Sequence, residues 1–123
     1  SIPEISADAP ALRQGFLNLL RNAFQAGATE IEIRTRVDYD ITVLQPGMGR
    51  VVRLDIKDNG CGVPESLRSM LFLPLVTGRR DGTGLGLALA QQIAAAHKGL
   101  LSYAPLDPGS RFTLRLPLQK NND

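Results

Sequence analysis

Two asparagines set four residues apart, Asn18 and Asn22, are the first side chains whose type and spacing could do chemistry. On a helix such residues lie one above the other on the same flank, and asparagine is a poor former of helix interiors. An amide oxygen is a hard ligand suited to Mg²⁺, and an amide NH₂ can donate to phosphate. Taken alone, the pair fits a solvated polar helix face better than a ligand site.

A second candidate is the segment 58–64, which follows an expected strand and contains Gly60 and Gly62. These glycines permit backbone conformations that other residues avoid, and they let a flat ligand approach closely. The carboxylate of Asp58 could accept a hydrogen bond from an exocyclic amine such as adenine N6. Because Asp, Asn and Gly are also the commonest turn residues, a plain turn between strand and helix remains an alternative.

The third candidate is the sequence Gly-Thr-Gly-Leu-Gly-Leu at residues 82–87, directly before an expected helix. Free backbone N–H groups at the positive end of a helix can hold phosphate oxygens. The strand that precedes a dinucleotide-binding glycine motif is absent, and no Walker A Gly-Lys-Ser/Thr follows. The alternative is a flexible linker, but the buried-type leucines between the glycines weigh against it.

The elements that must position these segments follow from the hydrophobic pattern. Apolar residues at helical spacing predict a helix that begins after an N-cap at Asp8 and stops at Gly27. The other expected elements are strands at 30–37, 51–56, 100–104 and 111–118, a hairpin turn at 46–49, and helices at 64–70 and 84–97. Some strands are adjacent along the chain and others are separated by helices. We therefore expect a two-layer α/β sandwich, with a mixed sheet and three helices on one face.

The composition is that of one globular domain. The chain has 123 residues, 43% of them hydrophobic, and a formal net charge of only +2 without a Lys/Arg run, so we expect no nucleic-acid contact. Cys61 is the only cysteine, which excludes a disulfide framework and a cysteine zinc cluster. No membrane span or signal segment stands out, so we expect a cytoplasmic domain without membrane contact. The abrupt start at Ser1 and the polar end suggest a piece of a longer protein.

In order and spacing, these segments resemble the motifs of the Bergerat-fold (GHKL) ATPases, the group that contains gyrase B, Hsp90, MutL and the histidine kinases. The matching segments are the N box at 18–26, the G1 box at 58–64, the kinases' F box at 71–74 and the G2 box at 82–87. The hydrolases of this group carry a glutamate as general base one turn before the second N-box asparagine. That position is Asn18 here, and an amide cannot take a proton from water. The resemblance therefore favours the histidine-kinase branch.

A long hairpin at 29–58 and a short lid at 74–81 narrow the resemblance further. Both are similar to those of the NtrB-type nitrogen-regulation sensor kinases, whose compact lid carries a Ser/Thr-Gly-Arg element. The lid residues Thr77 and Arg79 match that element. Where many kinases have lysine, Arg79 keeps the positive charge and adds a fork of donors.

The resemblance implies that ATP lies between the N-box helix and the lid, with Mg²⁺ bridging its phosphates. In this reading Asn22 coordinates the Mg²⁺, Asn18 supports the metal or phosphate shell, and Arg79 closes over the γ-phosphate, which makes these three the catalytic set. Asp58 would bind adenine N6. The other implied nucleotide-binding residues are Gly60, Gly62, Val63, Thr77, Gly82, Thr83, Gly84, Leu85 and Gly86.

The implied activity is that of the catalytic and ATP-binding domain, residues 1–123, of a two-component sensor histidine kinase. It would transfer the γ-phosphate to a histidine on a separate dimerisation and phosphoacceptor helical domain, which this chain lacks. Relay to an NtrC-like response regulator in nitrogen regulation, with a PII-type signal protein as a further partner, follows from the NtrB likeness. A GHKL hydrolase or protein-serine kinase, and a nucleotide-binding regulatory module without transfer activity, stay open. His97, the only histidine, is expected to interact with a helix end rather than accept phosphate.

Overall fold

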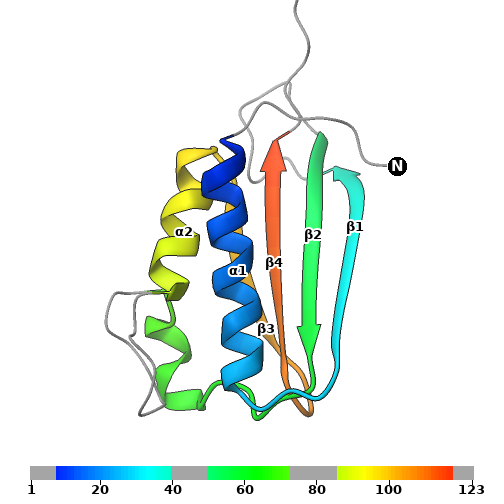
Figure 1. Ribbon diagram of the computed structural model, residues 1–123, viewed down its shortest axis with the longest axis vertical. Coiled ribbons are helices and arrows are strands. Elements are labelled where there is room, and N and C mark those ends of the chain that lie inside the picture. Colours follow the sequence, from blue (N-terminus) through cyan, green and yellow to red (C-terminus); the bar gives the residue numbers. More distant parts are fainter. Residues whose placement is uncertain (1–7, 40–49, 73–85, 118–123) are drawn as a thin grey trace, which may run out of the picture.

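The computed structural model describes residues 8–39, 50–72 and 86–117 of the chain. Two α-helices lie side by side and cover one face of a four-stranded sheet (Figure 1). The elements are α1 (Ala9–Gln25), β1 (Ile31–Tyr39), β2 (Arg50–Asp58), the 3₁₀ helix η1 (Glu65–Met70), α2 (Gly86–Ala96), β3 (Leu100–Pro105) and β4 (Ser110–Pro117). The expected two-layer α/β sandwich is confirmed. The short middle helix is of the 3₁₀ type, and β2 runs to Asp58, two residues beyond the predicted strand end.

The strands are ordered β1-β2-β4-β3, and every neighbouring pair in the described sheet is antiparallel. The expectation of a mixed sheet is therefore wrong for these strands. β2 and β3 do point the same way, as a strand–helix–strand connection predicts. However, β4 folds back from β3 and lies between the two, so that the parallel strands are not neighbours.

The sequence chemistry of α1 explains where it begins and which side it buries. The Asp8 side chain accepts a hydrogen bond from the Ala11 N–H at 3.1 Å, and proline occupies the first turn. Leu19 and Ala23 are buried toward the sheet, and Gly27 takes a φ of +80° just after the helix. The predicted cap and stop are both confirmed.

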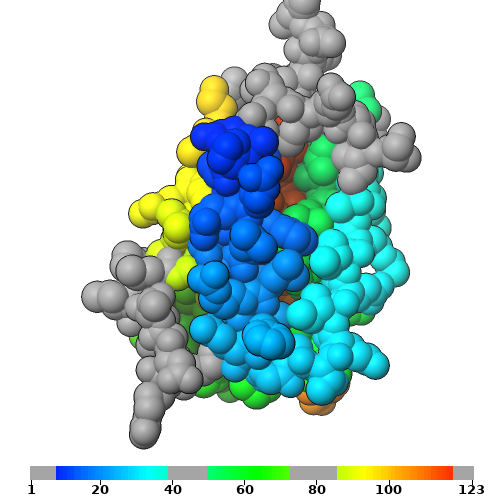
Figure 2. All heavy atoms as spheres, in the orientation of Figure 1, coloured from blue at the N-terminus to red at the C-terminus, as the bar shows by residue number. Residues whose placement is uncertain are grey.

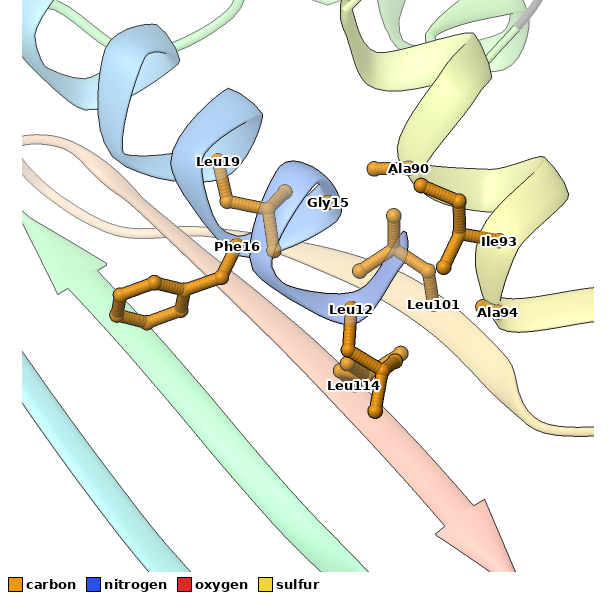
Figure 3. A pocket seen from close by; sticks show the side chains of 9 residues that line it. All are labelled: Leu12, Gly15, Phe16, Leu19, Ala90, Ile93, Ala94, Leu101 and Leu114. Atoms are coloured by element: carbon orange, nitrogen blue, oxygen red, sulfur yellow. The ribbon is translucent and has the colours of Figure 1, made fainter. Parts of the chain in front are cut away.

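The core lies between the helix layer and the sheet. Its largest fully buried side chains include Ile56 and Phe112, which face each other across β2 and β4. Between α1 and α2, Gly15 lies opposite Ile93, and a Cβ at Gly15 would meet Ile93 Cδ1 at an ordinary contact distance of 3.5 Å. A cavity of about 10 Å³ in this layer is lined by Leu12, Gly15, Phe16, Leu19, Ala90, Ile93, Ala94, Leu101 and Leu114 (Figure 3). Such a space has room for about one water and none for a nucleotide.

β1 lies at one edge of the described sheet, and the helices leave its inner face open. Its apolar residues Ile31, Ile33 and Val37 are all more than a third exposed. The surfaces of α1 and β1 appear on the same side of the molecule in Figure 2. Phe24 of α1 is 77% exposed. Charged residues alternate with the apolar ones along β1, and Arg34 pairs with Glu32 at 2.9 Å.

A buried carboxylate lies on the other face of the sheet. Asp55 of β2 accepts a hydrogen bond from the Thr113 hydroxyl at 2.6 Å and from Arg53 Nε at 3.1 Å. Burial alone raises the pKa of Asp55, but the bonds from Thr113 and Arg53 and the nearby arginine charges outweigh it. The pKa of Asp55 therefore lies below its ordinary value.

Candidate functional site

The two N-box asparagines are buried, so the solvated polar face is excluded. Asn18 and Asn22 are only 7% and 8% exposed, although both lie on the flank of α1 rather than on its core stripe. The Asn18 amide donates from Nδ2 to the Gly86 carbonyl at 3.3 Å, and its oxygen accepts from Gln14 Nε2 at 3.1 Å. Asn18 thus joins the middle of α1 to the first residue of α2, and both halves of its amide are in use.

Asp58, at the end of β2, is 5% exposed and faces the helix side of the sheet, as Ile56 does. Its Oδ1 accepts a hydrogen bond from the Gly60 N–H at 2.8 Å. Among the described residues, Oδ2 has no hydrogen-bond partner. The carboxylate is thus held in place through one oxygen and has an acceptor left on the other.

The G1 segment packs against the end of α1. The Cys61 N–H donates to the Ala26 carbonyl at 2.9 Å. A Cβ at Gly60 would lie 2.7 Å from the Ala26 oxygen and 2.8 Å from its Cβ, so a larger residue would force the two segments apart. The Asn59 side chain accepts from the Thr29 N–H at 2.9 Å and donates to the Thr29 hydroxyl at 2.9 Å. Gly62 has a φ of +76°, where glycine is favoured.

Sequence reasoning missed two positions next to Asp58. Gly109 has a φ of +108°, and a Cβ there would overlap the Asp58 carbonyl. Ser110 is buried and pairs with Asp58 across β2 and β4. The sequence does show a glycine directly before the last strand. Its contact with Asp58, however, depends on the register between two strands that are far apart in sequence.

The F box contributes a hydrophobic anchor. Leu71 is buried in the core, and the Phe72 ring packs edge-on against Phe112 with ring centroids 6.2 Å apart. Val63 of the G1 box is also buried in this core, so its side chain anchors the G1 loop to the core. Leu71 and Phe72 are therefore held by the core, directly before the segment that leads to the lid.

Several predicted site residues lie outside the described part of the chain. They are Thr77, Arg79, Gly82, Thr83, Gly84 and Leu85, together with the F-box residues Leu73 and Pro74. Their contacts with phosphate stay predictions. Of the G2 box, the described residues are Gly86 and Leu87, which open α2.

The donor set suits a magnesium ion that is carried largely by a nucleotide. In residues 8–39, 50–72 and 86–117, no group of three or more His, Cys, Asp or Glu could hold a metal. The buried amide of Asn22 supplies an oxygen of the kind that Mg²⁺ accepts. Mg²⁺ is commonly bound through a few protein ligands plus substrate phosphates, so this chemistry fits.

Comparison with known proteins shows the family to which the chain belongs. Residues 7–120 match the family described as histidine kinase-, DNA gyrase B-, and HSP90-like ATPase. The sensory histidine kinase/phosphatase NtrB of Klebsiella oxytoca is 37% identical over 123 residues, covering 98% of this chain and 35% of that protein. The chain thus spans about a third of the length of this relative. No helix in the described residues is long and apolar enough to span a membrane.

Solved structures agree in fold. The ATP-binding domain of PrrB from Mycobacterium tuberculosis is 30% identical with a TM-score of 0.69, over 97% of this chain and 78% of that one. Full-length ShkA, in complex with AMPPNP, is 29% identical with a TM-score of 0.70, over 99% of this chain and 24% of that one. The chain therefore belongs to the histidine kinase-, DNA gyrase B- and HSP90-like ATPases, within which it is an ATP-binding domain of the sensor histidine kinase type.

Proposed function

We propose that this domain binds MgATP and transfers its γ-phosphate to a histidine on a separate dimerisation and phosphoacceptor helical domain. The phosphate would then pass to a response regulator, as in two-component signalling. The likeness to NtrB supports a place in nitrogen regulation, with an NtrC-like regulator, a PII-type signal protein and a cytoplasmic location. Residues 1–123 would form the catalytic part of a longer protein.

The observation that carries this proposal is the environment of Asn18. A hydrolase of this family needs a general base one turn before Asn22, and a carboxylate there would activate water. Here the position holds an amide that donates to the Gly86 carbonyl and accepts from Gln14. This side chain cannot remove a proton from water, and both of its polar atoms already have partners. Transfer to a supplied nucleophile therefore fits the site better than hydrolysis does.

The remaining roles follow from the chemistry of each group. The second oxygen of Asp58 would accept from adenine N6, and the same oxygen would repel the O6 carbonyl of guanine. Asn22 would provide an oxygen ligand to Mg²⁺, which supplies charge neutralisation on the phosphates when bound. Arg79 and Thr77 would contact the γ end. The backbone from Gly82 to Gly86 would hold the phosphates by its N–H groups.

Transfer is tested by mixing labelled ATP, this domain and the phosphoacceptor domain of the same parent protein. We expect acid-labile label on the acceptor histidine, slow hydrolysis by the isolated domain, and no label on His97. Rapid hydrolysis by the isolated domain would favour the ATP-hydrolase alternative. If a well-folded acceptor stays unlabelled while ATP is bound, the domain is a nucleotide-binding module without transfer activity.

Adenine recognition is tested by Asp58→Asn, with Asp55→Asn as a matched control on the opposite face of β2. Loss of a hydrogen bond to a charged group costs about 1.5–3 kcal/mol, so ATP affinity should fall about tenfold or more. Preference for ATP over GTP should fall with it. Asp55→Asn should lower stability and leave affinity unchanged by calorimetry. Equal ATP affinity in a folded Asp58→Asn domain would remove Asp58 from the adenine site.

A further inference from the structure

His97, directly after α2, uses both ring nitrogens to join the two helices. Its Nδ1 lies 2.8 Å from the Ile93 carbonyl, one turn back in α2. Its Nε2 accepts a hydrogen bond from the backbone N–H of Asp8 at 3.0 Å. Asp8 is the N-cap residue of α1. The end of α2 is thus bonded to the start of α1, 89 residues away along the chain.

The two partners fix where the ring carries its proton. A carbonyl can only accept, so Nδ1 must carry the hydrogen that reaches Ile93. A backbone N–H can only donate, so Nε2 must keep its lone pair for Asp8. The geometry therefore requires a neutral imidazole with the proton on Nδ1. Neither an imidazolium nor the other tautomer can make both bonds.

A second bond joins the same helices at the opposite end of α2. There the Asn18 amide donates to the Gly86 carbonyl at 3.3 Å. The 11 residues of α2 span about 16 Å, so the two links lie roughly that far apart. Between them, Gly15 of α1 packs beside the Ile93 side chain of α2. With a link at each end, α2 can neither slide along α1 nor swing away from it without breaking a bond.

This arrangement connects His97 to the nucleotide site without contact between them. The first turn of α2 carries Gly86, and α1 carries the two asparagines. We infer that His97 is a positioning residue, whose bond to Asp8 holds α2 in the place where its first turn contacts Asn18. The inference rests on the proposed nucleotide site. It assigns the one histidine of the chain a role in ATP binding through helix placement rather than through phosphate acceptance.

Two substitutions separate the Asp8 bond from the rest of the side chain. His97→Gln can place an amide oxygen near the Nε2 position and keep an acceptor for Asp8. His97→Asn reaches only the Nδ1 position, so it can keep the bond to Ile93 and loses the one to Asp8. We expect His97→Asn to weaken ATP affinity about threefold to tenfold, the worth of one hydrogen bond, and His97→Gln to stay within about twofold of the unchanged chain. Calorimetry measures affinity, and urea unfolding measures stability.

Equal ATP affinity in both folded variants, with only His97→Asn less stable, would make the histidine purely structural and overturn the inference. If the unchanged chain does not bind ATP, the proposed function itself is refuted. Ring nitrogen chemical shifts give a readout that needs no variant, because the chain has one histidine. We expect the neutral Nδ1-protonated form, with shifts that change when ADP binds. The other tautomer, or a ring insensitive to nucleotide, would refute the inference even if His97→Asn fails to fold.

Discussion

Replacing Gly60 by alanine tests whether the G1 segment is pinned against α1. The added Cβ would lie 2.7 Å from the Ala26 oxygen and 2.8 Å from the Ala26 Cβ. Neither atom can rotate away, since one belongs to the backbone and the other is attached to it. The segment and the helix end must therefore separate by several tenths of an ångström. Overpacking of this kind costs about 1–3 kcal/mol.

The separation also disturbs the site, because the Gly60 N–H is the donor that holds Asp58 Oδ1 at 2.8 Å. We expect ATP affinity to fall about tenfold, as for a lost hydrogen bond to a charged group. Urea unfolding gives the stability, and calorimetry on the folded fraction gives the affinity. Gly15→Ala is the matched control, since its Cβ would meet Ile93 Cδ1 at an ordinary 3.5 Å. Alanine there should stabilise the helix by about 0.5–1 kcal/mol and leave affinity unchanged. A Gly60→Ala domain with unchanged midpoint and affinity would refute the reasoning.

Two further predictions concern the metal and the buried carboxylate. Asn22→Ala should abolish phosphotransfer in the full-length kinase and keep much of the adenine binding. Calorimetry should then find that nucleotide affinity depends less on Mg²⁺ than in the unchanged chain. An active Asn22→Ala kinase would show that Asn22 is not a metal ligand. Thr113→Val removes the 2.6 Å bond to Asp55 and should cost about 2 kcal/mol at neutral pH. Because the pKa of Asp55 is lowered in the folded state, its stabilising effect is complete above about pH 4 and is lost as the pH falls through that folded pKa. The difference from the unchanged chain should therefore shrink below about pH 4; a constant difference in urea unfolding would contradict this link.

Features encoded by neighbouring residues could be predicted from the sequence. The start of α1 follows from the Asp8 side chain and the proline after it, and its end follows from Gly27. The two-layer fold and the kinase-type motifs also depend on patterns within short segments. Asn18 and Asn22 were found by their spacing, and burial now excludes the solvated face.

Features that depend on pairing between distant segments could not be predicted. The position of β4 between β2 and β3 made every neighbour antiparallel, and no local pattern encodes that insertion. The bond from Asn18 to Gly86 joins residues 68 apart. The crowding of Gly109 against Asp58 likewise appears only when the strand register is known.

The open edge of β1 has a consequence for how copies of the domain avoid one another. An unpaired strand edge is a template for association between molecules, especially where one face is apolar as at Ile31 and Ile33. In a parallel, in-register stack of two such strands, Arg34 would lie beside Arg34 and Arg36 beside Arg36, and like charges in such pairs repel. No described element covers the outer edge of this strand, so its charges are the feature that opposes fibre formation there. Salt screens such charges, so protection against aggregation at this edge is strongest at low ionic strength.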